Sequence, residues 1–193
     1  KARAAGKELP EKAVLITFDG AYECTYANAY SVLRELGAKG NIFAAFNTIG
    51  KADLWKDPEF EPWINMATPE MMKEMRESGL IEFGSHTMTH SLLQELPAED
   101  AGWEIAESKK QLETELGQEI CAFAYPYGAG AGSQEIRAHV LQAGYALDFG
   151  LKQKKADWPW RSADGALPRL SVWRGDTTLD LKLLLLKGAS RLF

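Results

Sequence analysis

The fold is constrained most by a regular alternation of short apolar segments with amphipathic ones. Six segments have the apolar, β-branched character of strands, and they span 14–19, 41–46, 80–84, 120–125, 145–149 and 167–173. Segments with helical periodicity lie between or after them, at 26–36, 69–79, 97–116, 133–144 and 179–192. This alternation predicts a parallel sheet in an α/β fold, either open and doubly wound or a barrel lacking one or two strands.

Residues that favour helix ends support these boundaries. Thr68 and Pro69 form a good N-cap and first-turn pair, and Ser133 caps a later helix. Gly37 and Gly117 stand where a C-terminal glycine belongs. The strands are almost wholly apolar, so we expect a sheet that is buried on both faces.

The chain has 193 residues, which predicts a single domain over 1–193, and we expect a monomer. A net charge of −5 without a basic tract argues against binding nucleic acid. The longest leucine run, 183–186, is far too short for a transmembrane segment. The chain begins at Lys1 and not at Met, so we interpret it as a fragment truncated at its N-terminus. Cys24 and Cys121 could be free thiols or a disulfide.

Chemically useful residues gather where three strands end. The first strand runs into Asp19, the third leads to Ser85–His90, and the fourth to Phe123–Gly128. Asp148 is expected at the same edge. Ligand sites of parallel α/β folds lie at the carboxyl ends of the strands, so these ends predict one metal-assisted hydrolytic site.

His86 and His90 are the strongest metal-ligand candidates. In a helical turn their spacing of four would place both imidazoles on one side, as in other two-histidine zinc sites. A catalytic zinc usually takes three protein ligands, and Asp19 is the obvious partner, although it could instead cap the following helix. Asp148 and Asp157 are weaker candidates. His139 is expected at the surface or at the edge of the core.

Two further stretches leave alternatives open. The turn 123–128 places Pro and Gly around two tyrosines, and it could donate hydrogen bonds to a substrate carbonyl or simply pack the rim. The connection 47–67 carries Trp55, Phe60 and Trp63, which could face a substrate or cap the rim.

Taken together, these motifs resemble those of the polysaccharide deacetylases, the NodB-homology carbohydrate esterases of family 4. Thr17–Gly20 is similar to the first family motif, Thr-Phe-Asp-Asp-Gly, and Gly84–His90 closely matches the second. Phe123–Gly128 is similar to the third. With Leu167–Arg169 downstream, the chain is most similar to the branch that deacetylates poly-β-1,6-N-acetylglucosamine in biofilms.

The resemblance implies a distorted (β/α) barrel with fewer than eight strands. It also implies a divalent metal, most commonly zinc. The substrate would be a GlcNAc-based polysaccharide, modified outside the cell or at its surface. It makes Asp19 the general base and His86 and His90 the metal ligands. The backbone N–H of Tyr127 would stabilise the oxyanion. Arg169 would form an ion pair with Asp19 and adjust the pKa of its carboxyl. Contacts with the substrate would come from two aromatic residues, Tyr125 and Trp173.

Three departures from the family pattern bear on activity. Gly20 stands where the family has its second Asp, the third metal ligand, and it has no ligand atom. Ala124 replaces an Arg. No Leu-x-His near the C-terminus supplies the general acid, which in the biofilm branch lies upstream of the first motif. The chain is therefore expected to be a metal-dependent N-deacetylase, a non-catalytic glycan-binding relative, or a metalloenzyme of another class on a similar barrel.

Overall fold

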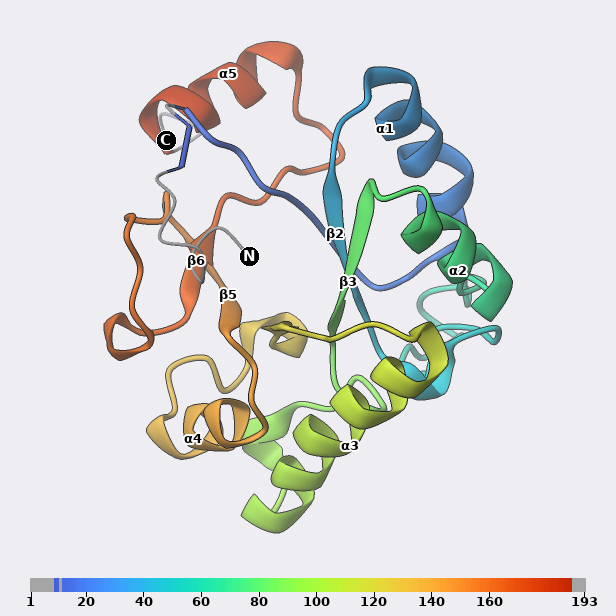
Figure 1. The fold of residues 1–193 in the computed structure, drawn as a ribbon, viewed down its shortest axis with the longest axis vertical. Coiled ribbons are helices and arrows are strands. Elements are labelled where there is room, and N and C mark those ends of the chain that lie inside the picture. The colour runs from blue at the N-terminus through green and yellow to red at the C-terminus, as the bar shows by residue number, and fades with distance from the viewer. Residues whose placement is uncertain (1–8, 11, 189–193) are drawn as a thin grey trace.

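The computed structural model describes residues 9–10 and 12–188, and its centre is a six-stranded parallel sheet with helices around it (Figure 1). The strands neighbour one another in sequence order, from β1 to β6. Their bounds are β1 Ile16–Asp19, β2 Gly40–Ala44, β3 Ile81–Ser85, β4 Ala122–Ala124, β5 Leu147–Gln153 and β6 Leu167–Arg169. The expected distorted (β/α) barrel with fewer than eight strands is confirmed.

Helices occupy the predicted connections. The α-helices are α1 Ser31–Leu36, α2 Pro69–Glu77, α3 Ala98–Leu116, α4 Gln134–Gln142 and α5 Thr178–Lys187. Shorter helical segments are the π-helix η1 Thr25–Tyr30 and the 3₁₀ turns η2 Phe46–Thr48, η3 Leu93–Glu95, η4 Pro126–Gly128 and η5 Ser162–Asp164. The predicted caps are confirmed, because the hydroxyls of Thr68 and Ser133 accept from the backbone N–H three residues on. The predicted end of the last helix, 189–192, lies outside the described residues.

The sheet separates two apolar clusters. Alternate strand residues such as Ile42 and Phe123 pack outward against the helices. Phe43, Ala124 and Phe149 instead share a smaller inner cluster with Trp160 and Leu167. The inner cluster fills the barrel directly below the strand ends that carry the polar residues.

The first strand differs from its prediction. We expected 14–19 to be buried, but Val14 is 64% exposed and Leu15 is 58% exposed, and the strand begins only at Ile16. Among the described residues, β1 is the first strand of an open sheet and pairs only with β2, so no described strand covers its other edge.

A side-chain bridge joins the two ends of the sheet. Arg169 at the end of β6 reaches Thr17 and Asp19 of β1, with its Nη1 at 3.3 Å from the hydroxyl of Thr17. The guanidinium also lies over the rings of Phe43 and Phe149, 5.6 and 6.0 Å from their centroids. The contact between Arg169 and Asp19 spans the gap between β1 and β6, and it brings the first and last strands to one site.

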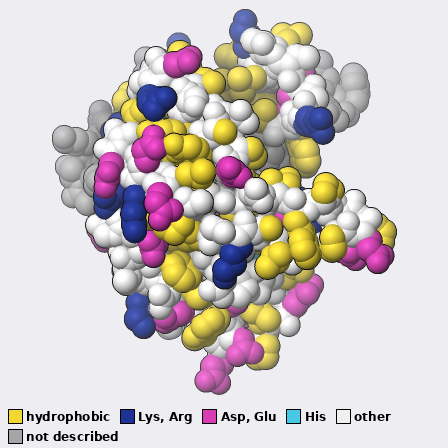
Figure 2. Space-filling view, turned by 90° about the vertical axis from the view of Figure 1, so that its right-hand side faces the viewer, with side chains coloured by type: hydrophobic (Ala, Val, Ile, Leu, Met, Phe, Trp, Pro, Cys, Tyr) yellow, Lys and Arg dark blue, Asp and Glu magenta, His cyan; other side chains and the backbone are white. Residues whose placement is uncertain are grey.

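The surface is chemically mixed, and the two cysteines are not bonded to each other. On the face that carries α1 and α2, small hydrophobic patches alternate with charges of both signs (Figure 2). Cys24 and Cys121 are both free and exposed. Over the described chain, no helix combines the length and the apolar character that crossing a membrane requires.

Candidate active site

Asp19 is held by a two-point ion pair. Nη1 and Nη2 of Arg169 donate to its two carboxylate oxygens at 2.6 and 2.7 Å. Burial raises the pKa of the Asp19 carboxyl, but the hydrogen bonds and the positive charge of Arg169 oppose burial, and that pKa is lowered overall. Asp19 is therefore an ionised carboxylate in a fixed orientation.

His86 directly follows β3 and is 1% exposed. Its Nδ1 lies 2.7 Å from the carbonyl oxygen of Ala124 in β4. A carbonyl can only accept, so Nδ1 carries the proton and Nε2 keeps a free lone pair, the arrangement found in metal-binding histidines. Burial also lowers the pKa of His86 and keeps the imidazole neutral.

His90 reaches the site by an irregular turn, not by the helical turn that its spacing suggested. The φ angles of Thr87 and His90 are +70° and +65°, and the N–H of His90 donates to the Thr87 hydroxyl at 2.9 Å. The ring centroid of His90 lies 4.8 Å from that of His86, edge-on. Burial, with the neighbouring His86, lowers the pKa of His90 to about 3.

Two residues shape this turn: Glu104, which the sequence did not single out, and Gly84, the first residue of the second motif. The Glu104 carboxylate of α3 accepts from the N–H groups of Met88 and Thr89 at 2.8 and 3.0 Å. Gly84 is required beside it, because a Cβ there would lie 2.5 Å from the ring of Phe43. The helix and the inner core thus fix the histidine-bearing loop from both sides.

The two tyrosines of the third motif have different positions. Tyr127 is 62% exposed with φ +54°, and its ring meets that of His90 edge-on at 5.1 Å. Tyr125 is 0% exposed, and its hydroxyl donates to Asp148 at 2.8 Å. The expectation that Tyr125 contacts substrate is wrong, because its ring lies in the core between sheet and helices.

Asp148 was expected at the site and instead lies near the start of β5, buried and paired with Arg137 of α4 at 2.9 Å. Asp157 is exposed and pairs with Lys154. Trp173 lies beyond the end of β6 with an exposed side chain, and its role as a substrate contact stays a prediction.

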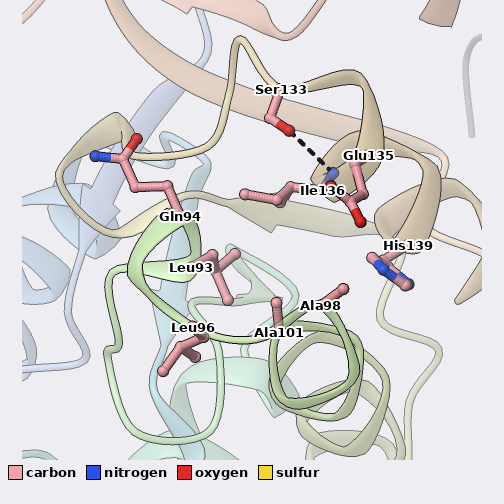
Figure 3. Close-up of a pocket in the computed structure, with 9 residues that line it drawn as sticks. All are labelled: Leu93, Gln94, Leu96, Ala98, Ala101, Ser133, Glu135, Ile136 and His139. Carbon is pink, nitrogen blue, oxygen red and sulfur yellow. Dashed lines mark hydrogen bonds between the residues drawn. The ribbon is translucent and has the colours of Figure 1, made fainter.

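His139 lies apart from the two other histidines. It lines a pocket formed by η3, α3 and α4, into which Ile136 and Leu93 also point (Figure 3). The remaining lining residues are Gln94, Leu96, Ala98, Ala101, Ser133 and Glu135. This position at the edge of the core agrees with the expectation for His139.

Trp55 was seen only as part of a loop, and the structure places it at the site. Its ring stacks on His90 with centroids 4.1 Å apart and planes 13° apart. Tyr22 meets Trp55 edge-on at 6.3 Å. The loop is anchored by Asp53, which accepts from the N–H of Ile64 at 2.6 Å. Phe60 stays exposed. The sequence signal for Trp55 was the long aromatic connection 47–67, and for Tyr22 it was only the position after a strand end.

A divalent metal fits the histidine pair. Nε2 of His86 is free to coordinate, and Nδ1 of His90 is buried without a hydrogen-bond partner in the described structure. A buried nitrogen of this kind is costly unless a ligand satisfies it. No third His, Cys, Asp or Glu joins them to complete a three-residue group within the described residues. The chain thus offers two clear donors and lacks the expected second carboxylate.

Comparison with known proteins agrees with this arrangement. The family model for polysaccharide deacetylase matches residues 6–147. A Bacillus subtilis protein that carries the name polysaccharide deacetylase YxkH is 36% identical over 122 residues, 63% of this chain and 39% of its own length. The poly-β-1,6-N-acetyl-D-glucosamine N-deacetylase of Staphylococcus epidermidis is 29% identical, covering 89% of this chain and 58% of its own length.

Among solved structures, IcaB from Ammonifex degensii is similar to this chain. It is 27% identical, has a TM-score of 0.72, and covers 89% of this chain and 72% of its own. The chain spans only about half the length of the curated relatives above. The matched motifs, the barrel and the family model agree, and the chain belongs to the polysaccharide deacetylase family.

Proposed function

We propose that this chain is the catalytic core of a metal-dependent N-deacetylase that removes acetyl groups from a GlcNAc polysaccharide, with poly-β-1,6-GlcNAc as the favoured substrate. The observation that carries the proposal is the meeting of His86 and His90 with an Arg-held carboxylate, Asp19, at the strand ends of one barrel. Because the chain resembles the poly-β-1,6-GlcNAc deacetylases, we also propose extracellular or cell-surface action.

The residues divide the chemistry between them. His86 and His90 would hold a divalent metal, zinc being favoured, which when bound supplies Lewis acidity and lowers the pKa of water. Asp19 accepts the proton from the attacking water, and Arg169 keeps this carboxylate ionised and aimed. Tyr127 stands beside His90, where its backbone N–H is proposed to donate to the oxyanion.

The substrate assignment is supported by the name of one relative. The S. epidermidis relative is named for poly-β-1,6-N-acetyl-D-glucosamine, and the matched stretch covers most of this chain. Trp173, together with Tyr127, is exposed near the strand ends, and flat aromatic faces suit the apolar faces of sugar rings.

Acetate release from a β-1,6-linked GlcNAc oligomer, with added Zn²⁺ or after chelation, tests the proposal. We expect metal-dependent release that falls about 10²- to 10⁴-fold in Asp19→Asn, because the general base is lost. Asp157→Asn, an exposed carboxylate on a loop, is the matched control and should keep wild-type activity. Release that persists unchanged in Asp19→Asn would exclude this residue as the base.

A second function, glycan binding without catalysis, is favoured by one observation. Gly20 lacks a ligand atom, and both oxygens of Asp19 are occupied by Arg169. The same oligomer separates the two functions. Binding measured by calorimetry without acetate release under any divalent metal would favour the binding protein.

A further inference from the structure

The ring of Tyr22 occupies the space beside Gly20. A Cβ built at Gly20 would lie 2.4 Å from Cε2 of Tyr22, 2.9 Å from Cδ2 and 3.1 Å from Cζ, the atom that carries the hydroxyl. A side chain at residue 20 would therefore begin inside this phenol. The φ of Gly20, +83°, also disfavours any residue with a Cβ.

The backbone and the neighbouring rings hold Tyr22 in this place. Tyr22 forms an antiparallel bridge with Met66, and the N–H of Glu23 donates to the carbonyl of Asn65 at 3.0 Å. Its ring packs edge-on against Trp55, which stacks on His90. The phenol thus belongs to the same aromatic cluster as the unsatisfied imidazole.

Other oxygen donors near the pair already have strong partners. Arg169 takes both oxygens of Asp19. Oδ1 of Asp53 accepts from the N–H of Ile64, and its Oδ2, which accepts no hydrogen bond within the described structure, is held in an ion pair with Lys56 at 3.1 Å. A tyrosine phenolate is an anionic oxygen donor that is known as a metal ligand, for example to iron. Tyr22 has the oxygen that Gly20 lacks, and it projects from the same strand end.

We propose that Tyr22 supplies the third protein donor to a metal held by His86 and His90, in place of the absent carboxylate at residue 20. On binding, the phenol O–H bond breaks, the proton passes to water, and the oxygen forms a bond to the metal without any change in oxidation state. The inference rests on the metal-binding part of the proposed function and needs neither the substrate nor turnover.

A spectroscopic titration of the whole chain with Cu²⁺ tests the proposal directly, because a phenolate bound to copper adds a charge-transfer band in the visible range. We expect this band in the wild type and its loss in Tyr22→Phe, which removes only the oxygen. Competition titration with Zn²⁺ should show at least about 10-fold weaker binding in Tyr22→Phe. Tyr26→Phe, whose hydroxyl donates to Glu74 at 2.6 Å, is the matched control.

A second pair of variants tests the shared space. Gly20→Asp alone should not strengthen zinc binding, because the ring blocks the new side chain and the backbone is strained. Gly20→Asp combined with Tyr22→Ala should regain zinc affinity relative to Tyr22→Ala, since the carboxylate then has room. Circular dichroism of each metal-free variant checks that it folds.

The proposal is overturned if Tyr22→Phe keeps both the visible band and the zinc affinity, or if the wild type binds no metal. Its failure is distinct from failure of the proposed function. A wild type that shows the band but releases no acetate refutes the deacetylase and leaves Tyr22 as a ligand. If the wild type releases acetate and Tyr22→Phe binds metal as the wild type does, only the role of Tyr22 is refuted.

Discussion

Two opposing effects determine the protonation state of the Asp19 side chain. Burial favours the neutral acid, whereas the bidentate guanidinium of Arg169 favours the carboxylate, and the carboxylate prevails. The same Arg169 also donates to the carbonyl of Gly150 at 2.9 Å, so its own position is fixed by β5. Arg169 thus determines both the charge and the orientation of the Asp19 carboxylate, the proposed base.

Replacing Arg169 tests this control. In Arg169→Gln the positive charge is lost while burial remains, so the pKa of Asp19 should rise. The acid limb of the kcat/KM profile should then move to higher pH, with a loss of about 10²-fold at neutral pH. Arg161→Gln, at an exposed arginine paired with Asp164, is the control, and an unmoved acid limb in Arg169→Gln would contradict the assignment.

The buried histidines make a prediction about pH and stability. Both pKa values are lowered in the folded state, while in the unfolded chain they lie near 6.5. The unfolded state therefore takes up protons first, and the stability present above about pH 6.5 is lost on acidification toward pH 3.

We expect the metal-free protein to lose about 1 to 2 kcal/mol through His90 between pH 7 and 5, with a further loss through His86, measured by urea unfolding with a chelator present. In His90→Gln, the free energy of unfolding should change less with pH between pH 7 and 5. An equal slope in the variant would mean that His90 is not held neutral.

At the scale of elements, a buried ion pair connects α4 to the sheet. Arg137 of α4 reaches Asp148 of β5 through two hydrogen bonds and the carbonyl of Ser162 through a third. Tyr125, beyond the end of β4, donates to the same carboxylate. Helix, strand and the third-motif turn therefore share one charge network beneath the site.

Removing the central carboxylate should destabilise the fold strongly. Asp148→Ala leaves the largely buried Arg137 without its partner, at a cost of about 3 to 5 kcal/mol in the free energy of unfolding. Asp164→Ala breaks an exposed pair and should cost less than about 1 kcal/mol. Denaturant midpoints compare them, and equal losses would show that the network adds little.

At the scale of the whole molecule, the site draws on strands from both ends of the sheet. Asp19 comes from β1, His86 and His90 follow β3, and Arg169 comes from β6. A metal that binds only the folded arrangement stabilises the entire barrel by mass action.

Zinc should therefore raise the melting temperature of the protein. At a free concentration of about 100 times its Kd, the expected stabilisation is about 2.7 kcal/mol, and a chelator should reverse it. His86→Ala should show no such shift, because the ligand nitrogen is gone. A shift of equal size in His86→Ala would place the metal elsewhere.

The sequence by itself determined the order of strands and helices and the residues that carry the motifs. Apolar periodicity and helix caps are local properties, so Thr68 and Ser133 could be read directly from the chain. The gathering of polar residues at the strand ends could be predicted as well, because a parallel sheet brings those ends together. His86, His90 and Asp19 belong to this group.

Only the tertiary structure decided which side chains contact one another. Tyr125 and Asp148 look like site residues along the chain, yet the sheet turns them toward the helices and into one hydrogen bond. Trp55 reaches the ring of His90, and Tyr22 meets the edge of Trp55, only when the loop 47–67 folds over the strand ends. Such contacts join residues far apart in sequence, and their geometry depends on packing that no local pattern encodes.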